Sequence, residues 1–309
     1  MSTRGERRRT FRRKYLSGLA VAGAALLVSA AGASAASSGA VAAKASGVVD
    51  VLSAGSLDTL MTKSVGPAFH KATGYTLSDI SMGSSSLAAD LKNKVYAADI
   101  FVSASPTVTK SLEGKKNGNW VSWYADFADS PEVLGYNPKS KFAQDLKTKP
   151  WYDVVTMPGF LLGRTNPSQD PGGVLAAKAL TETATAEHLP ALKTLATETS
   201  DEYPEDTEEA GIQNGQLDGA FMYAADAISQ GSPYVKLVGP KSNSTLAGEY
   251  TISILKGSKH TAAAEAFVKF LLGHTGQAEM KHDKFGVVSP AKVSGKGVPS
   301  SLTSFLKSH

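Results

Sequence analysis

Short apolar runs alternate with helical patterns along the chain from residue 48 onward. A β-branched run at residues 48–52 predicts a strand. The segment 57–69 then repeats apolar residues at helical spacing and ends at Gly74. Two further strands are predicted at residues 75–82 and 99–102, with a helix between them. Strand and helix therefore follow each other in turn, which is typical of α/β proteins.

The same alternation continues through the second half of the chain. The remaining predicted strands lie at residues 133–136, 159–163, 218–223, 234–238 and 250–255, and helices are predicted from Val174 and over 261–272 and 275–282. This order favours α/β architecture with mainly parallel sheets flanked by helices. A length of 309 residues fits two such sheets.

Three of the predicted strands end in turns rich in small or hydroxyl-bearing residues. These turns lie at residues 54–56, 83–86 and 166–173, and each one opens a helix. Ligands of open α/β sheets bind beyond the carboxyl ends of the strands, where helix N-termini present free N–H groups. Serine hydroxyls add further donors, so the pattern indicates a pocket for an anion. The alternative is that each serine only caps its helix.

The first 35 residues have the character of an export signal. Basic residues in 4–14 precede an apolar run at 16–31 and the small-residue motif that ends at Ala35, so cleavage is expected near Ala36. Arg8-Arg9 also matches a twin-arginine signal. An uncleaved membrane anchor is the alternative. Residues 36–47 are small and polar and are predicted to be a flexible lead-in.

Composition excludes several classes of function. The leader carries a net charge of +6 and the rest of the chain −2, so the body lacks the basic face of a nucleic-acid binder. The absence of cysteine removes disulfides, thiolate metal sites and cysteine nucleophiles. No zinc, P-loop or hydrolase-elbow motif is present. The acidic run at residues 201–209 lacks a calcium-loop pattern and is predicted to be a solvated face.

Several short motifs, taken together in order, resemble one family. They are the residues at 54–57, 83–87, 98–104, 133–137, 139–141, 151–152, 166–167, 170–172, 215–218, Phe221 with Tyr223, 285–286 and 289–290. In these motifs the chain resembles the molybdate/tungstate-binding components of ABC importers, which are periplasmic binding proteins of type II. The resemblance covers residues 48–290.

This resemblance implies a two-lobed α/β fold that closes on its ligand, with hinge strands between the lobes. Lobe 1 would comprise residues 48–131 and 248–309, and lobe 2 residues 132–247. The protein would be an exported, monomeric, non-enzymatic solute-binding protein that delivers the oxyanion to an ABC permease and its ATPase. No resident cofactor is implied, because the oxyanion is the cargo.

The resemblance also implies roles for individual residues. Gly55 and Ser56 look like the first group of oxyanion donors, and Ser85 like the second, with Ser84 and Ser86 as close competitors. Tyr223 looks like a hydroxyl donor. Dianions such as molybdate accept hydrogen bonds and offer none, so a pocket of donors suits them.

Two positions depart from a simple donor pocket. Asp170, with Gly172, looks like the lobe 2 contact, and in one branch of the family this aspartate coordinates the metal together with a glutamate. Met222 stands where that glutamate is expected, and its thioether cannot supply the second carboxylate ligand. Arg164 is the one arginine after the leader, and our hypothesis is that it neutralises Asp170 or contacts the anion. A purely structural partner for Arg164 is the alternative.

Other functions remain open from the sequence. Another tetrahedral oxyanion, such as sulfate or phosphate, is the first alternative ligand. Ferric iron is less favoured because only Tyr223 is expected in the cleft. A secreted hydrolase that uses a serine of residues 84–86, and a sensor or adhesion domain without a permease, are alternatives of other classes. Molybdate and tungstate are not distinguished by the sequence, since they are similar in size and charge.

Overall fold

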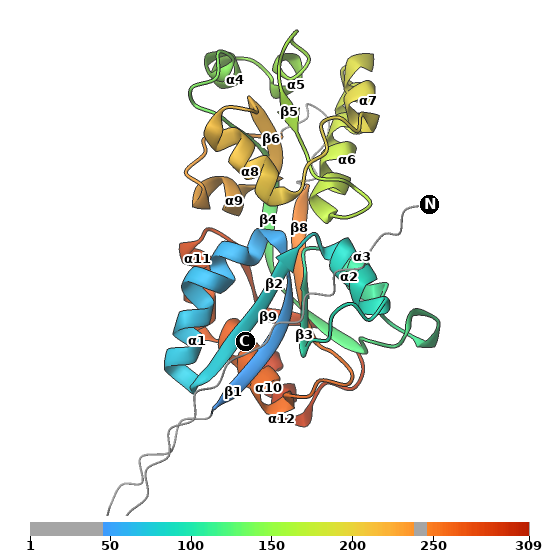
Figure 1. Ribbon diagram of the computed structural model, residues 1–309, viewed down its shortest axis with the longest axis vertical. Helices are drawn as coiled ribbons and strands as arrows, with labels where there is room; N and C mark the ends of the chain where they lie inside the picture. The colour runs from blue at the N-terminus through green and yellow to red at the C-terminus, as the bar shows by residue number, and fades with distance from the viewer. Residues whose placement is uncertain (1–45, 238–245, 309) are drawn as a thin grey trace, which may run out of the picture. The chain divides into compact units, whose positions relative to one another are not determined.

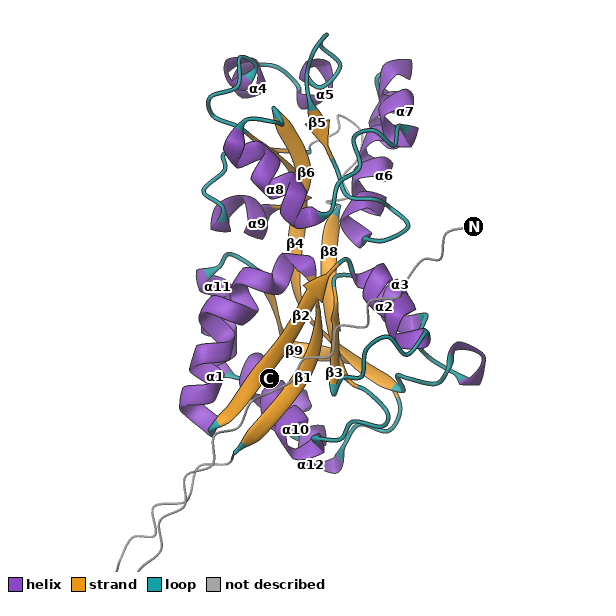
Figure 2. Cartoon of the chain, viewed as in Figure 1, coloured by secondary structure: helices purple, strands orange, loops and turns teal. Residues whose placement is uncertain are grey.

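A computed structural model describes residues 46–237 and 246–308 of the chain. The predicted leader 1–35, most of the lead-in and residues 238–245 lie outside this range. The strands are β1 (Gly47–Ala54), β2 (Tyr75–Met82), β3 (Ile100–Ser103), β4 (Trp123–Tyr136), β5 (Leu162–Gly163), β6 (Gly219–Tyr223), β7 (Tyr234–Lys236), β8 (Ala247–Ile254) and β9 (Gly286–Gly295). Helices flank them, as Figures 1 and 2 show.

Each predicted helix has a counterpart in the structure, and further short helices that the sequence did not predict join the strands. The α-helices are α1 (Gly66–Thr73), α2 (Ser84–Lys92), α3 (Pro106–Lys110), α4 (Ala143–Thr148), α5 (Trp151–Val154), α6 (Pro171–Ala186), α7 (Pro190–Thr197), α8 (Glu205–Asn214), α9 (Ala224–Ser229), α10 (Thr261–Leu272), α11 (His274–His282) and α12 (Ser300–Thr303). A 3₁₀ turn η1 (Gly55–Leu57) and a π-helical turn η2 (Leu60–Val65) lead into α1. Gly74 ends α1 in the left-handed conformation, with φ of 87°.

The long strand β4 links two sheet regions. Its residues from Trp123 to Pro131 pair with β8 and β9, beside β3, β1 and β2. Its residues from Glu132 to Tyr136 pair with β6 and β7, and β5 follows β6. We call these the first and the second sheet region. The change of partner falls between Pro131 and Glu132.

The pairings are more mixed than the predicted parallel sheets. β1 pairs in parallel with β2 and β3, and β5 with β6. The pairs that involve β4 and the pair of β3 with β8 are antiparallel. The parallel pairs are those joined through helical crossovers, whereas β4 runs from the first sheet region into the second. The α/β class is therefore confirmed, with antiparallel strands where the regions meet.

Each sheet region has its own apolar core. Phe69 of α1 packs edge-on against Phe267 of α10 in the first, with ring centroids 5.2 Å apart. Trp151 of α5 packs edge-on against Phe221 of β6 in the second, at 5.7 Å. Burial of such side chains stabilises each region by its apolar area. Both regions place the carboxyl ends of strands toward the site described next.

Candidate binding site

A pocket of about 740 Å³ is lined by segments from both sheet regions. Its lining residues in the first region are Gly55, Ser56, Asp58, Thr59, Lys63, Ser81, Met82, Gly83 and Ser86, and in the second region Thr165, Asn166, Gln169, Asp170, Tyr203, Pro204, Glu205, Asp206, Glu209, Asp226, Ser229 and Gln230. The turns after β1 and β2 therefore meet the loop before α6, as the strand-end argument predicts.

The turn after β1 presents Ser56 to the pocket. Strand β1 ends at Ala54, and η1 begins at Gly55 with Ser56 buried. The Tyr250 hydroxyl of β8 donates a 2.9 Å hydrogen bond to the Ser56 hydroxyl oxygen. Because the Ser56 oxygen accepts this bond, the hydroxyl proton of Ser56 is available to donate to a ligand. A Cβ on Gly55 would overlap the carboxylate of Glu205, so glycine permits this close approach.

The turn after β2 places Ser86, rather than Ser84 or Ser85, on the pocket lining. Ser84 is fully buried, and its hydroxyl accepts a 3.1 Å bond from the backbone N–H of Ala104. That hydroxyl therefore has a structural partner. The backbone N–H of Ser86 donates to the Gln169 carbonyl at 3.0 Å, which links the two sheet regions across the pocket.

Asp170 is the N-cap of α6. Its Oδ1 accepts from the backbone N–H of Gly172 at 2.7 Å and from the Thr165 hydroxyl at 3.1 Å. Burial raises the pKa of Asp170, and hydrogen bonds from Gly172, Thr165, Gly173 and Ser84 offset part of that rise. Gly172 itself is buried in the first turn and is not a lining residue. Asp170 thus lies at the pocket with several donors already around its carboxylate.

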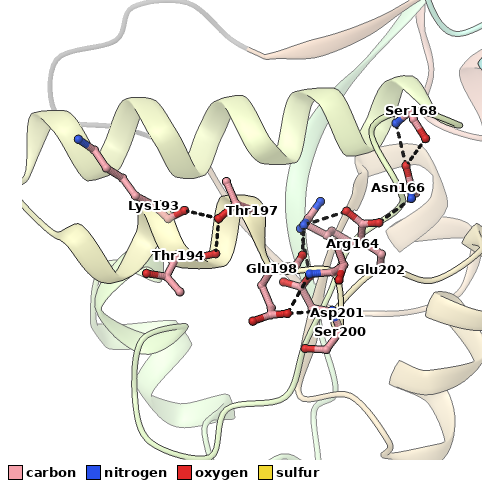
Figure 3. A network of polar contacts seen from close by, with 11 residues as sticks. Arg164, Asn166, Ser168, Lys193, Thr194, Thr197, Glu198, Ser200, Asp201 and Glu202 are labelled. Atoms are coloured by element: carbon pink, nitrogen blue, oxygen red, sulfur yellow. Dashed lines mark hydrogen bonds and ion pairs between the residues drawn. The ribbon is translucent and has the colours of Figure 1, made fainter.

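Arg164 does not pair with Asp170. Its guanidinium is fully buried and lies 3.3 Å from Asp201 and 3.1 Å from Glu202, and it also donates to the carbonyl of Glu198 (Figure 3). Its backbone binds the same segment, because the Tyr203 N–H donates to the Arg164 carbonyl. Arg164 is also absent from the pocket lining. The hypothesis that it neutralises Asp170 or contacts the anion is therefore corrected: it anchors the loop that leads to α8.

Tyr223 lies beneath the pocket lining. Its ring packs edge-on against Tyr250 with centroids 6.0 Å apart, next to Gly248. Its hydroxyl is buried and has no hydrogen-bond partner. Burial raises the pKa of Tyr223, with a further contribution from Asp170, so the hydroxyl stays protonated and remains a donor. Met222 points elsewhere and packs among apolar residues such as Val133 and Ile212.

Sequence reasoning missed an acidic wall, which we define as Glu205, Glu209 and Asp226. The run at residues 201–209 is not a solvated face, since Asp201 and Glu208 are buried and Glu205 and Glu209 line the pocket. Burial raises the pKa of Glu209 to about 7, with repulsion from nearby acids. Burial also raises the pKa of Glu205 and Asp226 well above the usual range. Tertiary folding brings α8 and α9 together, so no local pattern signals the wall.

Comparison with known proteins identifies the family. A sequence profile of the bacterial extracellular solute-binding proteins matches residues 49–285. The chain belongs to this family. An uncharacterized solute-binding protein of Petrotoga mobilis is 25% identical over 245 residues, which cover 68% of this chain and 74% of the relative. The molybdate/tungstate-binding protein WtpA of Pyrococcus abyssi is 22% identical over 275 residues, covering 74% and 79%.

Solved structures agree with this solute-binding fold. The periplasmic molybdate-binding protein of Azotobacter vinelandii superposes with a TM-score of 0.61 at 17% identity, covering 78% of this chain and 100% of that one. The two-lobed type II fold expected from the motifs is confirmed. The family consists of binding components of ABC importers and not of enzymes, so the serine-hydrolase alternative is excluded.

Family membership also bears on location and partners. A solute-binding protein of this kind is exported and interacts with an ABC permease and its ATPase. Within residues 46–237 and 246–308, no helix has the length and apolar character needed to cross a membrane. The predicted signal cleavage near Ala36 falls outside the described residues.

Proposed function

We propose that this solute-binding protein captures a metal oxyanion of the molybdate or tungstate type and delivers it to an ABC permease. The observation that carries the proposal is the meeting of two donor-bearing turns, 55–56 and 83–86, with the Asp170 loop at one pocket. Relatives named as molybdate/tungstate-binding support the choice of ligand. Export through a cleaved leader and action as a monomer belong to the same proposal.

In this proposal the donors divide between the two sheet regions. Ser56 donates its hydroxyl proton, and Gly55 its backbone N–H, from the turn after β1. The start of α2 adds the N–H group of Ser85, because the N-terminus of a helix favours negative charge and the Ser86 N–H already donates to the Gln169 carbonyl. Tyr223 supplies the buried hydroxyl that lacks a protein partner. Ser84 and Gly172 act on Asp170 instead, since their backbone N–H groups already bond to that carboxylate and hold it at the pocket.

Direct coordination of the metal by Asp170 is the second part of the proposal. Donors surround this carboxylate in the present conformation, so coordination requires the exchange of some of those hydrogen bonds. Asp170→Asn keeps the N-cap acceptor but cannot supply a carboxylate ligand. X-ray absorption of the bound metal then distinguishes the two roles. A coordination number that falls in the variant supports direct coordination, and an unchanged tetrahedral spectrum contradicts it.

Titration calorimetry tests the ligand itself. The purified protein is titrated with molybdate, tungstate, sulfate and phosphate in turn, in a buffer that contains calcium and magnesium salts. Tight one-to-one binding of molybdate and tungstate, with sulfate and phosphate far weaker, is the expected result. If only sulfate or phosphate binds, the ligand is another tetrahedral oxyanion and the proposed ligand is wrong. No heat of binding with any of the four anions would overturn the proposal.

A further inference from the structure

The acidic wall brings three carboxylates together from two helices. Glu205 and Glu209 lie one turn apart on α8, and Asp226 lies on α9. One oxygen from each of the three lies within 4.8 Å of the other two. A Ca²⁺ ion holds its oxygen ligands at about 2.3–2.6 Å, so oxygens on opposite sides of the ion lie about 5 Å apart. The three oxygens are therefore spaced for a single cation.

Asp226 provides an independent sign of a missing partner. Its side chain is 5% exposed, and its Oδ2 is buried with no hydrogen-bond partner. A buried carboxylate oxygen without a partner is costly, and such oxygens are normally paired or bound to a metal. Glu209 differs, because the Gln230 side chain donates to it at 2.6 Å. The carboxylate that carries this unsatisfied oxygen thus belongs to the cluster, where a cation would provide the missing partner.

The excess of acidic residues in the pocket lining also favours a bound cation. Among the described residues that line it, six are aspartate or glutamate and one, Lys63, is basic. A dianion beside ionised carboxylates is repelled by about 1 kcal/mol or more for each close pair, depending on the local dielectric. A cation held among these carboxylates would offset that repulsion.

We propose that Glu205, Glu209 and Asp226 hold a hard divalent cation of the Ca²⁺ class, and that this cation supplies the positive charge which an oxyanion needs in the pocket. The cation site stands on the geometry of the three carboxylates. The coupling to an oxyanion rests on the proposed function. All-oxygen donor sets select Ca²⁺, Mg²⁺ or Mn²⁺ over softer metals. Ca²⁺ is the first choice among them, because it accepts flexible carboxylate geometry, whereas Mg²⁺ needs ligands at about 2.0–2.1 Å in a tight octahedron.

Calorimetry with the metal alone tests the site. The full chain is treated with a chelator, dialysed and titrated with CaCl₂ and then, separately, with MgCl₂. We expect one Ca²⁺ per chain, weaker Mg²⁺ binding, and an increase in the melting temperature on Ca²⁺ addition. Glu209→Gln and Asp226→Asn should each weaken Ca²⁺ binding by about tenfold or more, since affinity follows the number of charged ligands.

A matched control removes one carboxylate outside the pocket. Glu182→Gln, on the exposed face of α6 beside Lys178, makes the same chemical change and should leave Ca²⁺ affinity within about twofold of the wild type. Melting curves of all variants verify that they fold. No heat of Ca²⁺ binding with the folded wild type, or equal losses in Glu209→Gln and Glu182→Gln, would overturn the site.

A second titration separates this proposal from the proposed function. Molybdate is titrated into the chelated protein with and without Ca²⁺. Binding that is at least about tenfold tighter with Ca²⁺ supports the coupling, which is reciprocal by linkage. Molybdate binding that is equal in both buffers overturns the coupling and leaves the proposed function intact. Ca²⁺ binding with no response to molybdate in either buffer supports the cation site and contradicts the proposed ligand.

Discussion

The Tyr250 hydroxyl donates a 2.9 Å hydrogen bond to the Ser56 hydroxyl, joining β8 to the turn after β1. Both side chains are buried, and Ser56 lines the pocket. The bond restricts the direction of the Ser56 proton, because the hydroxyl oxygen of Ser56 already accepts from Tyr250. A donor held in place before binding costs less entropy when the ligand arrives.

Ser56→Ala should weaken molybdate binding by about 1–3 kcal/mol, because it removes a donor to a charged acceptor. Tyr250→Phe should cause a smaller loss, since Ser56 keeps its hydroxyl but loses its orientation. The double variant should lose less than the sum of the two, because the residues act together. Calorimetry on all three proteins measures the differences. Unchanged affinity in Ser56→Ala would remove Ser56 from the site.

Arg164 should matter for stability and not for the affinity of the anion. Its buried guanidinium pairs with Asp201 and Glu202, and removing one partner of such a pair costs about 3–5 kcal/mol. Arg164→Met should therefore lower the melting temperature strongly. Measured below that temperature, the folded variant should bind molybdate within about threefold of the wild type, because Arg164 touches none of the proposed donors. A selective loss of affinity without a loss of stability would restore the anion-contact role.

Glu132 should make the protein less stable as pH rises. It lies on β4 with both carboxyl oxygens buried and without partners, and burial raises its pKa well above 4.5, with Asp170 and Asp226 adding to the rise. The folded protein therefore holds a proton that the unfolded chain releases, so stability falls as pH increases through the folded-state pKa. Glu132→Gln removes this linkage.

Thermal unfolding at pH 5 and pH 8 measures the effect of Glu132. The drop in melting temperature from pH 5 to pH 8 should be smaller in Glu132→Gln than in the wild type, and by more than in the surface control Glu182→Gln. Glu208 and Asp226 also have raised pKa values from burial, so part of the wild-type slope should remain in the variant. A slope identical to that of the wild type would show that Glu132 does not titrate as described.

Gly83 should control the contact between the two sheet regions. A Cβ at this position would lie 2.5 Å from the Gln169 carbonyl oxygen and 3.1 Å from Oδ2 of Asp170. Gly83→Ala should therefore push the start of α2 away from the loop before α6, at a cost of about 1–3 kcal/mol. We expect weaker molybdate binding and, in small-angle scattering, a larger radius of gyration with ligand present. A ligand-bound radius equal to that of the wild type would contradict this role for Gly83.

The sequence by itself determined the local elements with good accuracy where their patterns are strong. The strand β2 and the helix α10 have the predicted bounds, because alternation and helical spacing act within a few residues. The turns after β1 and β2 were likewise found from serine and glycine alone. The resemblance in motifs led to the right family, and the motifs at 54–57, 83–87 and 170–172 lie in segments that the fold brings to one pocket.

Only the tertiary structure decided which groups meet in that pocket. From the sequence, Arg164 was a candidate anion contact. In the structure it pairs with Asp201 and Glu202, which lie more than 30 residues away in the chain and could not be predicted as its partners. The acidic run looked like a solvated surface because charge patterns carry no information on burial. The wall of Glu205, Glu209 and Asp226 exists because α8 and α9 pack side by side beyond β6 (Figure 1). Contacts of this range depend on the packing of whole elements, which periodicity does not encode.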